Sequence, residues 1–330
     1  MLNVLLNGHG AVIINKLLAI DGHDDCVVRV VTHAHSDHLI ELDKSVSKCK
    51  GVIGTPLTIE WINELNHLIP SNKAIKLEYE HQIKIDDVVV LLKKSHHIPG
   101  ASQVVITDSD GLRIVYTSDF KRPGSSTPIV ESDILILDAV YGHPTYVRSF
   151  DDHIDEVLTD LVKQLLAKGP VAIYGYHGKL QEVMEILRVG GVIAPYVLPS
   201  KVYRLTKVAE RYGLKIGDYF LYDSDEGVEA VRSGWFITFN HVSSRNLIND
   251  PKVSHIILSG WEFKKPYRYL GRKRWLIAFS DHADFNGLIN YVVNSNPRTI
   301  IVNSVRSSYP EIFAKEVRRI TGKECIAMPS

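Results

Sequence analysis

One short histidine-rich motif constrains this chain more than any other feature. Directly after the apolar run Cys26–Val31, the sequence from His33 onward reads His-Ala-His-Ser-Asp-His. If the apolar run is a buried strand, the chain continues extended beyond it, so His33, His35 and Asp37 project to one side. His38 then turns in beside them. Imidazole suits zinc, a carboxylate adds a harder ligand, and no thiol lies nearby to close a structural site. The motif predicts a site for two divalent ions; the alternative is a polar loop with surplus histidine.

Composition places few limits on function but excludes some partners. The 330 residues are 45% hydrophobic and 23% charged, which is typical of a soluble globular protein. Because 38 basic residues balance 38 acidic ones, nucleic-acid affinity must come from a local patch. Three distant cysteines fit neither a disulfide framework nor a zinc ribbon, and they favour a reducing, cytoplasmic location. We expect no membrane partner, since no apolar run approaches a membrane span.

The chain contains two regions with different patterns of predicted secondary structure. Short predicted strands fill most of residues 1–148, interrupted by a helix over Pro56–Leu65, which is typical of a two-sheet sandwich. From Phe150 onward helices alternate with strands, as in a small parallel α/β unit. The strand Trp275–Phe279 then returns to the earlier style. We therefore expect one domain made of residues 1–148 and 275–330, with an α/β unit of residues 149–274 inserted into it.

Further ligand candidates follow other predicted strands. His97 lies before a Pro-Gly turn after the strand Val88–Leu92, and Asp119 follows the strand Arg113–Tyr116. A pair of ions needs a bridging carboxylate, which favours a metal role for Asp119 over a simple turn residue. Asp21 lies in an Asp-Gly pair before the histidine motif. It is either an acceptor that supports the histidines or part of an ordinary turn.

These motifs resemble those of the metallo-β-lactamase superfamily. The run from His33 to His38, His97 before Pro-Gly, and Asp119 in Ser-Asp-Phe match its successive metal motifs, and Asp21 matches its first motif. The resemblance implies an α/β fold of the αββα sandwich type. It also implies that His33, His35 and His97 hold one ion, that Asp37 and His38 hold the other, and that Asp119 bridges the two. Zinc is expected most, with manganese or magnesium as alternatives at a weaker second position.

Within the superfamily the chain resembles the β-CASP nucleases. Asp138 matches the family's acidic motif A, and His282 in Ser-Asp-His-Ala-Asp-Phe matches its histidine motif B. The inserted α/β unit then corresponds to the family's cap domain. The resemblance implies that Asp37 serves the reaction as well as the metal, that His282 protonates the departing sugar oxygen, and that Asp138 orients His282 by a hydrogen bond. The ligase-associated exonucleases and the Artemis-like crosslink-repair branch match best.

One motif departs from the RNA-processing members of this family. Their motif C is a histidine that completes the second metal site, whereas our alignment places Ser304 at that position, beside the second ion. We therefore expect the second ion to bind weakly or to arrive with substrate. Because similar enzymes that act on DNA also lack this histidine, the change favours DNA.

A basic and aromatic run predicts a nucleic-acid surface. Residues 263–275 contain four aromatic residues and no acid, together with the cations Lys264, Lys265, Arg268, Arg272, Lys273 and Arg274. Cations can follow phosphates while rings stack on bases, as in single-strand binders; the alternative is a solvated loop. Lys121 and Arg122, shortly after Asp119, are further candidate phosphate-binding cations. Lys179, in the turn Gly175–Lys179, either helps to seat a terminal phosphate or belongs to an ordinary strand-to-helix turn.

The sequence thus predicts a metal-dependent phosphodiesterase, favoured as a 5′-to-3′ DNA exonuclease in repair that acts on single strands or DNA ends. An RNA-processing exo- or endoribonuclease is the nearest alternative. A small-molecule metallohydrolase would not need the inserted unit or the basic run. An inactive nucleic-acid-binding relative would be expected to have lost ligands that are present here.

Overall fold

The computed structural model describes residues 3–246, 248 and 250–329. It divides into two compact units, one made of residues 1–147 with 281–330 and the other of residues 148–280. The return to the first unit therefore comes at Asp281, six residues later than the sequence indicated. The difference lies in β18 (Arg274–Ile277), which the sequence assigned to the first domain. In the structure β18 pairs with β16 (Ser254–Leu258) in the second unit. Its apolar pattern marks a buried strand but does not say which sheet the strand joins.

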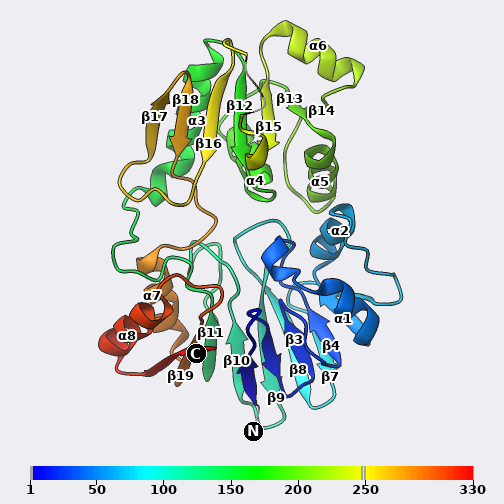
Figure 1. The fold of residues 1–330 in the computed structure, drawn as a ribbon, viewed down its shortest axis with the longest axis vertical. Helices are drawn as coiled ribbons and strands as arrows, with labels where there is room; N and C mark the ends of the chain where they lie inside the picture. Colours follow the sequence, from blue (N-terminus) through cyan, green and yellow to red (C-terminus); the bar gives the residue numbers. More distant parts are fainter. Residues whose placement is uncertain (1–2, 247, 249, 330) are drawn as a thin grey trace. The chain divides into compact units, whose positions relative to one another are not determined.

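The first unit contains two sheets (Figure 1). The six-stranded sheet has the order β1 (Val4–Leu6), β2 (Val12–Ile14), β3 (Leu18–Ile20), β4 (Val28–Val30), β5 (Gly51–Gly54) and β6 (Ala74–Lys76). The seven-stranded sheet has the order β20 (Glu324–Met328), β19 (Thr299–Asn303), β11 (Ile134–Leu137), β10 (Arg113–Tyr116), β9 (Ser102–Asp108), β8 (Val88–Lys94) and β7 (Gln82–Ile85).

Apolar side chains from both sheets pack together and form the core of the first unit. Val12 and Ile20 of the first sheet belong to the same buried cluster as Val90 and Ile106 of the second. Each such side chain contributes roughly 1.5–3 kcal/mol by its burial. The alternation of buried and partly buried residues along β8 shows why one face of that strand turns inward.

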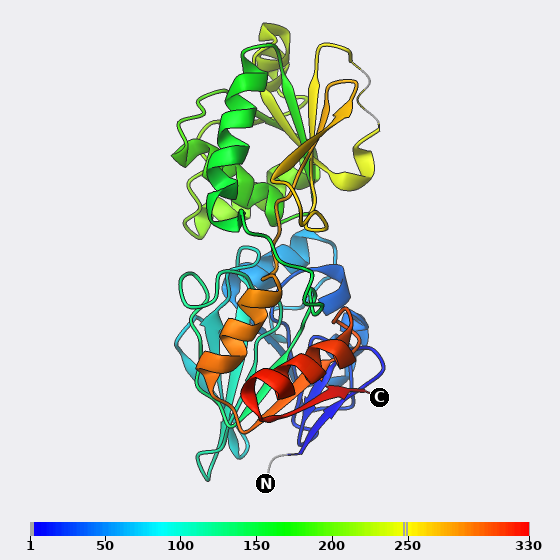
Figure 2. The same cartoon turned by 90° about the vertical axis from the view of Figure 1, so that its left-hand side faces the viewer.

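Helices cover the outer faces of both sheets. α1 (Leu42–Lys48) and α2 (Pro56–Glu64) lie against β5 and β6, and α2 begins where the Thr55 side chain accepts a hydrogen bond from the Thr58 N–H. On the other side, α7 (Phe285–Ser295) and α8 (Pro310–Thr321) lie next to each other (Figure 2) and pack on the second sheet through a shared apolar cluster. The predicted αββα sandwich is confirmed.

The second unit is a mostly parallel sheet flanked by helices. Its strand order is β14 (Tyr219–Leu221), β13 (Tyr196–Leu198), β15 (Ile237–His241), β12 (Val171–Gly175), β16, β18 and β17 (Tyr267–Gly271). Only the last pair, β17 and β18, is antiparallel among these neighbours. α3 (Ile154–Leu166) and α4 (Lys179–Val189) pack on one face; the other helices are α5 (Ser200–Arg211) and α6 (Asp225–Ser233).

Strand direction gathers the predicted ligands of the first unit. β10, β11 and β19 run parallel, and β8 runs the same way because both β8 and β10 are antiparallel to β9. The carboxyl ends of all four strands therefore meet at one edge of the sheet. His97, Asp119 and Asp138 follow three of these ends. None of the helices in the described residues is long and apolar enough to cross a membrane.

Candidate metal centre

Four side chains from three separate segments form a compact, largely buried cluster in the first unit. His33, His35, His97 and Asp119 each place one ligand atom within 4.8 Å of the others. His35 Nδ1 lies 3.2 Å from His33 Nε2 and 3.0 Å from His97 Nε2. Asp119 Oδ2 lies 3.7 Å from His33 Nε2 and 3.5 Å from His97 Nε2. Ligands at zinc distances in a tetrahedron are about 3.3 Å apart, so the cluster fits one such ion.

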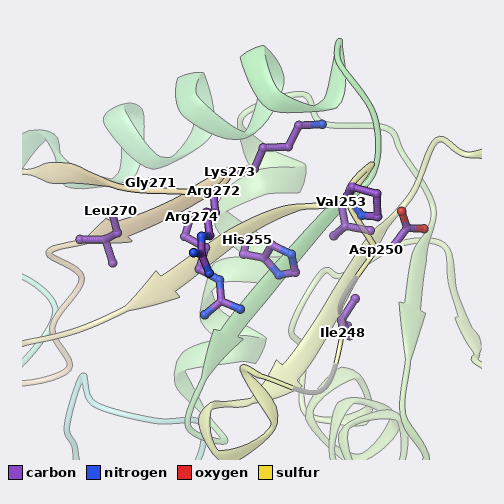
Figure 3. Close-up of a pocket in the computed structure, with 10 residues that line it drawn as sticks. Ile248, Asp250, Val253, His255, Leu270, Gly271, Arg272, Lys273 and Arg274 are labelled. Carbon is purple, nitrogen blue, oxygen red and sulfur yellow. The ribbon is translucent and has the colours of Figure 1, made fainter.

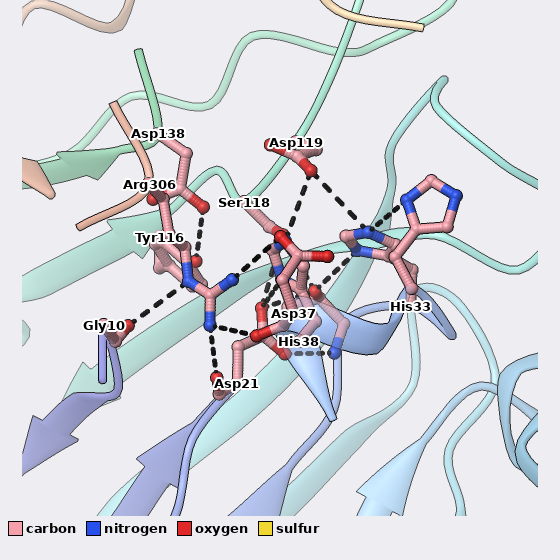
Figure 4. Close-up of polar contacts among 12 residues, drawn as sticks. Gly10, Asp21, His33, Asp37, His38, Tyr116, Ser118, Asp119, Asp138 and Arg306 are labelled. Carbon is pink, nitrogen blue, oxygen red and sulfur yellow. Dashed lines mark hydrogen bonds and ion pairs between the residues drawn. The ribbon is translucent and has the colours of Figure 1, made fainter. Parts of the chain in front are cut away.

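A second cluster shares one atom with the first. Asp37, His38 and Asp119 also have ligand atoms within 4.8 Å of one another. His38 Nε2 lies 3.3 Å from Asp37 Oδ2 and 3.2 Å from Asp119 Oδ2. Asp119 Oδ2 thus faces both clusters, as Figure 4 shows. An oxygen shared in this way is what a bridging carboxylate requires.

Hydrogen bonds on the far side of two imidazoles fix which nitrogen faces the clusters. His97 Nδ1 donates to the carbonyl oxygen of Asp281 at 2.9 Å, so its Nε2 carries the free lone pair. His38 Nδ1 lies 2.8 Å from Asp21 Oδ2, which orients that ring in the same sense. Partners of this kind are typical of histidines that bind metal.

Asp21 is a buried acceptor for the histidine motif. Its carboxylate is fully buried and accepts hydrogen bonds from the Thr32 N–H at 2.8 Å and the Thr32 hydroxyl at 2.6 Å, besides its contact with His38. Ser118, next to Asp119, donates to the same carboxylate at 3.3 Å. Of the two interpretations left open by the sequence, the structure favours the supporting acceptor.

Burial keeps the imidazoles of His33 and His97 neutral. Burial, followed by the neighbouring histidines, lowers the pKa of His33 well below its ordinary value. Burial also lowers the pKa of His97 to about 3. Neutral imidazole is the form that ligates metal. The second cluster differs, because Asp21, Asp37 and Asp119 outweigh burial and the Arg306 charge and raise the pKa of His38.

An arginine that the sequence did not single out supports the loop. Arg29 on β4 is fully buried and donates to the His38 carbonyl oxygen at 2.9 Å and to Ser45 Oγ in α1 at 3.3 Å. Burial lowers the pKa of Arg29 to about 10, so the side chain is charged at neutral pH. It fastens the metal motif to the helix that follows. A single arginine inside an apolar strand gave no signal of this role in the sequence.

Several known proteins are similar to this chain in sequence. No protein-family profile matches the chain. An uncharacterized protein from the lig 3′ region of Acidianus ambivalens is 44% identical over 138 residues, covering 42% of this chain and 99% of that protein. A probable DNA ligase of Opitutus terrae is 23% identical and covers 86% of this chain, and RNase aCSPSF2 of Saccharolobus solfataricus is 24% identical and covers 48%. This chain spans only 27% and 37% of those two proteins.

The comparison with solved structures concerns the fold alone. A crystal structure of a protein of unknown function from Enterococcus faecalis superposes with a TM-score of 0.61 and 16% identity, over 92% of this chain and 79% of that one. Together with relatives named as RNases and as DNA cross-link repair 1A proteins, the ligand pattern decides the family. The chain is a β-CASP member of the metallo-β-lactamase superfamily.

The β-CASP motif residues Asp138 and His282 both lie in the first unit. His282 Nδ1 is 3.5 Å from Asp119 Oδ1, and its ring packs 4.8 Å from that of His97. The Asp138 carboxylate accepts a hydrogen bond from the Tyr116 hydroxyl at 2.6 Å, which is not the partner expected from the sequence. Burial raises the pKa of Asp138 to about 7. Tyr116 was not anticipated, because it ends an ordinary apolar strand.

The second metal position has an unexpected neighbour. Ser304 donates its backbone N–H to the Met328 carbonyl at 2.7 Å. The side chain that reaches Asp37 is instead that of Arg306, with Nη1 3.3 Å from Asp37 Oδ2. A single arginine two residues after the expected motif C histidine has no distinctive spacing, so sequence reasoning missed it.

Three of the predicted substrate-binding cations are not freely exposed. Lys121 and Lys179 are 6% exposed, and Lys179 Nζ donates to the Phe279 carbonyl at 3.2 Å. Arg122 is partly buried and has a positive φ of 49°. Burial of the Lys121 and Lys179 side chains counts against a direct phosphate contact from an open surface.

The basic run of the second unit is largely exposed. Its middle forms β17, where Tyr267 and Tyr269 are 45% and 60% exposed. Arg268 forms an ion pair with Glu262 at 2.6 Å. The exposed cations of the run, besides Arg268, are Lys264, Lys265, Arg272 and Lys273, with Arg274 partly buried.

Proposed function

We propose that this β-CASP protein is a metal-dependent nuclease. The observation that carries the proposal is the pair of His/Asp clusters that share Asp119 Oδ2. Divalent ions held by these residues would supply Lewis acidity to a phosphodiester and neutralise charge on its oxygens. We assign residues 1–147 and 281–330 to the metallo-β-lactamase domain and residues 148–280 to the cap.

The chain's own residues have distinct tasks in this proposal. His33 and His97 present neutral imidazoles, His35 contributes a third imidazole, and Asp119 holds the negative charge between the clusters. His282, whose side chain is 24% exposed, gives a proton to the departing sugar oxygen. Asp138 contributes a carboxyl with a pKa near neutrality, held in place by Tyr116. A residue with such a pKa can gain or lose a proton at working pH.

DNA is the favoured substrate, with 5′-to-3′ exonucleolytic action in repair. The missing motif C histidine supports it, as do relatives named as a probable DNA ligase and as DNA cross-link repair 1A proteins. Relatives named as RNases support RNA as the second candidate. Buried free thiols at all three cysteines support a reducing, cytoplasmic location.

The β17–β18 hairpin is the candidate nucleic-acid surface of the cap. Its turn places Gly271, Arg272 and Lys273 at positive φ values of 85°, 50° and 54°. Positive φ is costly for arginine and lysine, and such conformations gather at functional sites. The turn borders a cavity of about 650 Å³. In Figure 3 Arg274 and His255, which pair across β18 and β16, lie next to each other in this cavity.

This surface offers two kinds of contact to a single strand. Exposed lysine and arginine side chains suit phosphates, and the exposed rings of Tyr267 and Tyr269 suit stacked bases. Stacking on a ring contributes about 1–3 kcal/mol per base.

Cleavage of matched substrates tests the proposal. Single-stranded DNA and RNA of one sequence, labelled at either end, are incubated with zinc, manganese or magnesium. We expect shortening from the 5′ end of DNA, and loss of cleavage in the Asp37→Ala variant. Asp110→Ala is the matched control, because Asp110 is exposed in the turn between β9 and β10. If neither nucleic acid is cut with any metal, the nuclease proposal fails; RNA cleavage alone selects the second candidate.

A further inference from the structure

Arg306 presents a buried positive charge to the second metal cluster. Its side chain is 5% exposed, and three chain segments surround its guanidinium (Figure 4). Nη2 donates to the carbonyl oxygens of Asp21 at 2.5 Å and Asp37 at 2.8 Å, while Nε donates to the Gly10 carbonyl at 3.4 Å. With its fork fixed by backbone carbonyls, the guanidinium has little freedom to move away.

The same guanidinium contacts the ligand atom itself. Asp37 Oδ2 is 3.3 Å from Arg306 Nη1 and also 3.3 Å from His38 Nε2. This oxygen would be the Asp37 ligand atom for an ion held by the second cluster. A divalent cation in that position must therefore share Asp37 with Arg306 or displace it.

We propose that Arg306 sets the metal stoichiometry by competing with the second ion for Asp37. The first cluster keeps its ion, whereas the second ion competes with the Arg306 charge and binds weakly until an anionic phosphate adds negative charge. The inference rests on the metal centre of the proposed function, but not on the identity of the substrate.

A positioning role and a competing-charge role for Arg306 predict opposite changes in metal affinity when its side chain is removed. If Arg306 only positioned Asp37, its loss would loosen a ligand and weaken the second site. If it competes as a cation, its loss makes the second cluster more negative and strengthens that site. Metal affinity measured without nucleic acid therefore separates the two roles, and separates this inference from the nuclease proposal.

Manganese titration of the chelator-stripped full chain provides the test, with bound ion counted by electron paramagnetic resonance. We expect one tight and one weak ion in the wild-type protein. Arg306→Gln should bind the second ion at least tenfold more tightly, whereas Arg306→Lys keeps the charge and should keep the second site weak. Arg298→Gln is the matched control, since the Arg298 side chain is 85% exposed directly before β19 and forms an ion pair with Asp133.

An unchanged or weaker second site in folded Arg306→Gln overturns the inference. If that variant does not fold, the wild-type protein still decides, through crystal structures without metal and with excess manganese. Separation of Asp37 Oδ2 from Arg306 on loading supports competition. A structure in which the second ion is bound while Asp37 Oδ2 stays 3.3 Å from Arg306 Nη1 overturns the inference.

Discussion

The two metal clusters share Asp119 but differ in almost everything around it. The first is built from three imidazoles, two of them buried, with pKa values of His33 and His97 lowered by burial. The second depends on Asp37, whose side chain is 63% exposed, and on His38, whose pKa is raised by carboxylates. Because one loop supplies ligands to both, the surroundings rather than the motif decide how tightly each cluster binds.

The largest expected effect comes from the shared ligand. Asp119→Asn should abolish the binding of both ions and lower the cleavage rate at least a thousandfold. That loss corresponds to an increase of about 4 kcal/mol in the activation free energy. Metal content and cleavage rate measure the outcome, with Asp110→Asn as control. Retention of either ion at wild-type affinity would break the claim that Asp119 serves both clusters.

Single-cluster variants sharpen the comparison. His97→Ala should remove the tight ion, since His97 belongs only to the first cluster, whereas Asp37→Ala should leave that ion in place and remove the weak one. Calorimetric titration with zinc distinguishes the two. Loss of the tight ion in Asp37→Ala would show that the clusters are not independent.

Asp21 offers a smaller and more selective change. Asp21→Asn keeps the size of the side chain but weakens its hold on His38 Nδ1. Loss of such a supporting contact typically costs 10–100-fold in metal affinity, so roughly that loss is expected at the second cluster. The first cluster should change by only a few-fold. An equal effect on both ions would assign Asp21 a general structural role.

The smallest effect is expected away from the metals. Replacing Arg272 and Lys273 by glutamine should weaken single-strand binding. The slope of the logarithm of the binding constant against the logarithm of the salt concentration should become shallower by roughly 0.7 per lost phosphate contact. Metal content should not change. Lys163 and Lys168, exposed in the same unit, provide the double-glutamine control. An unaltered salt slope would remove the hairpin from the nucleic-acid surface.

Sequence patterns predicted the elements that depend on local alternation. The strands Val12–Ile14 and Arg113–Tyr116 lie where the pattern placed them, and α2 begins at the predicted Pro56. The pattern could not assign β18 to its sheet, because a buried strand looks alike in either unit. Pairing of distant strands is a tertiary property.

The candidate site shows the same division. His33, His97 and Asp119 could be proposed because the dense His33–His38 motif is uncommon without a metal, and His97 and Asp119 follow predicted strands elsewhere. Arg29 and Arg306 could not, since one arginine in a strand or after it has no distinctive spacing. Only the folded chain shows that these guanidinium groups reach the carbonyl oxygens of the metal loop.

Anomalous diffraction tests the central claim most directly. Crystals of the full chain are prepared with one equivalent of zinc and then with excess manganese, and each metal is located at its own absorption edge. We predict a zinc peak bonded to His33, His35, His97 and Asp119, followed by a manganese peak between Asp37, His38 and Asp119. A single zinc peak on the Asp37 side, or no peak at either cluster, would contradict the account.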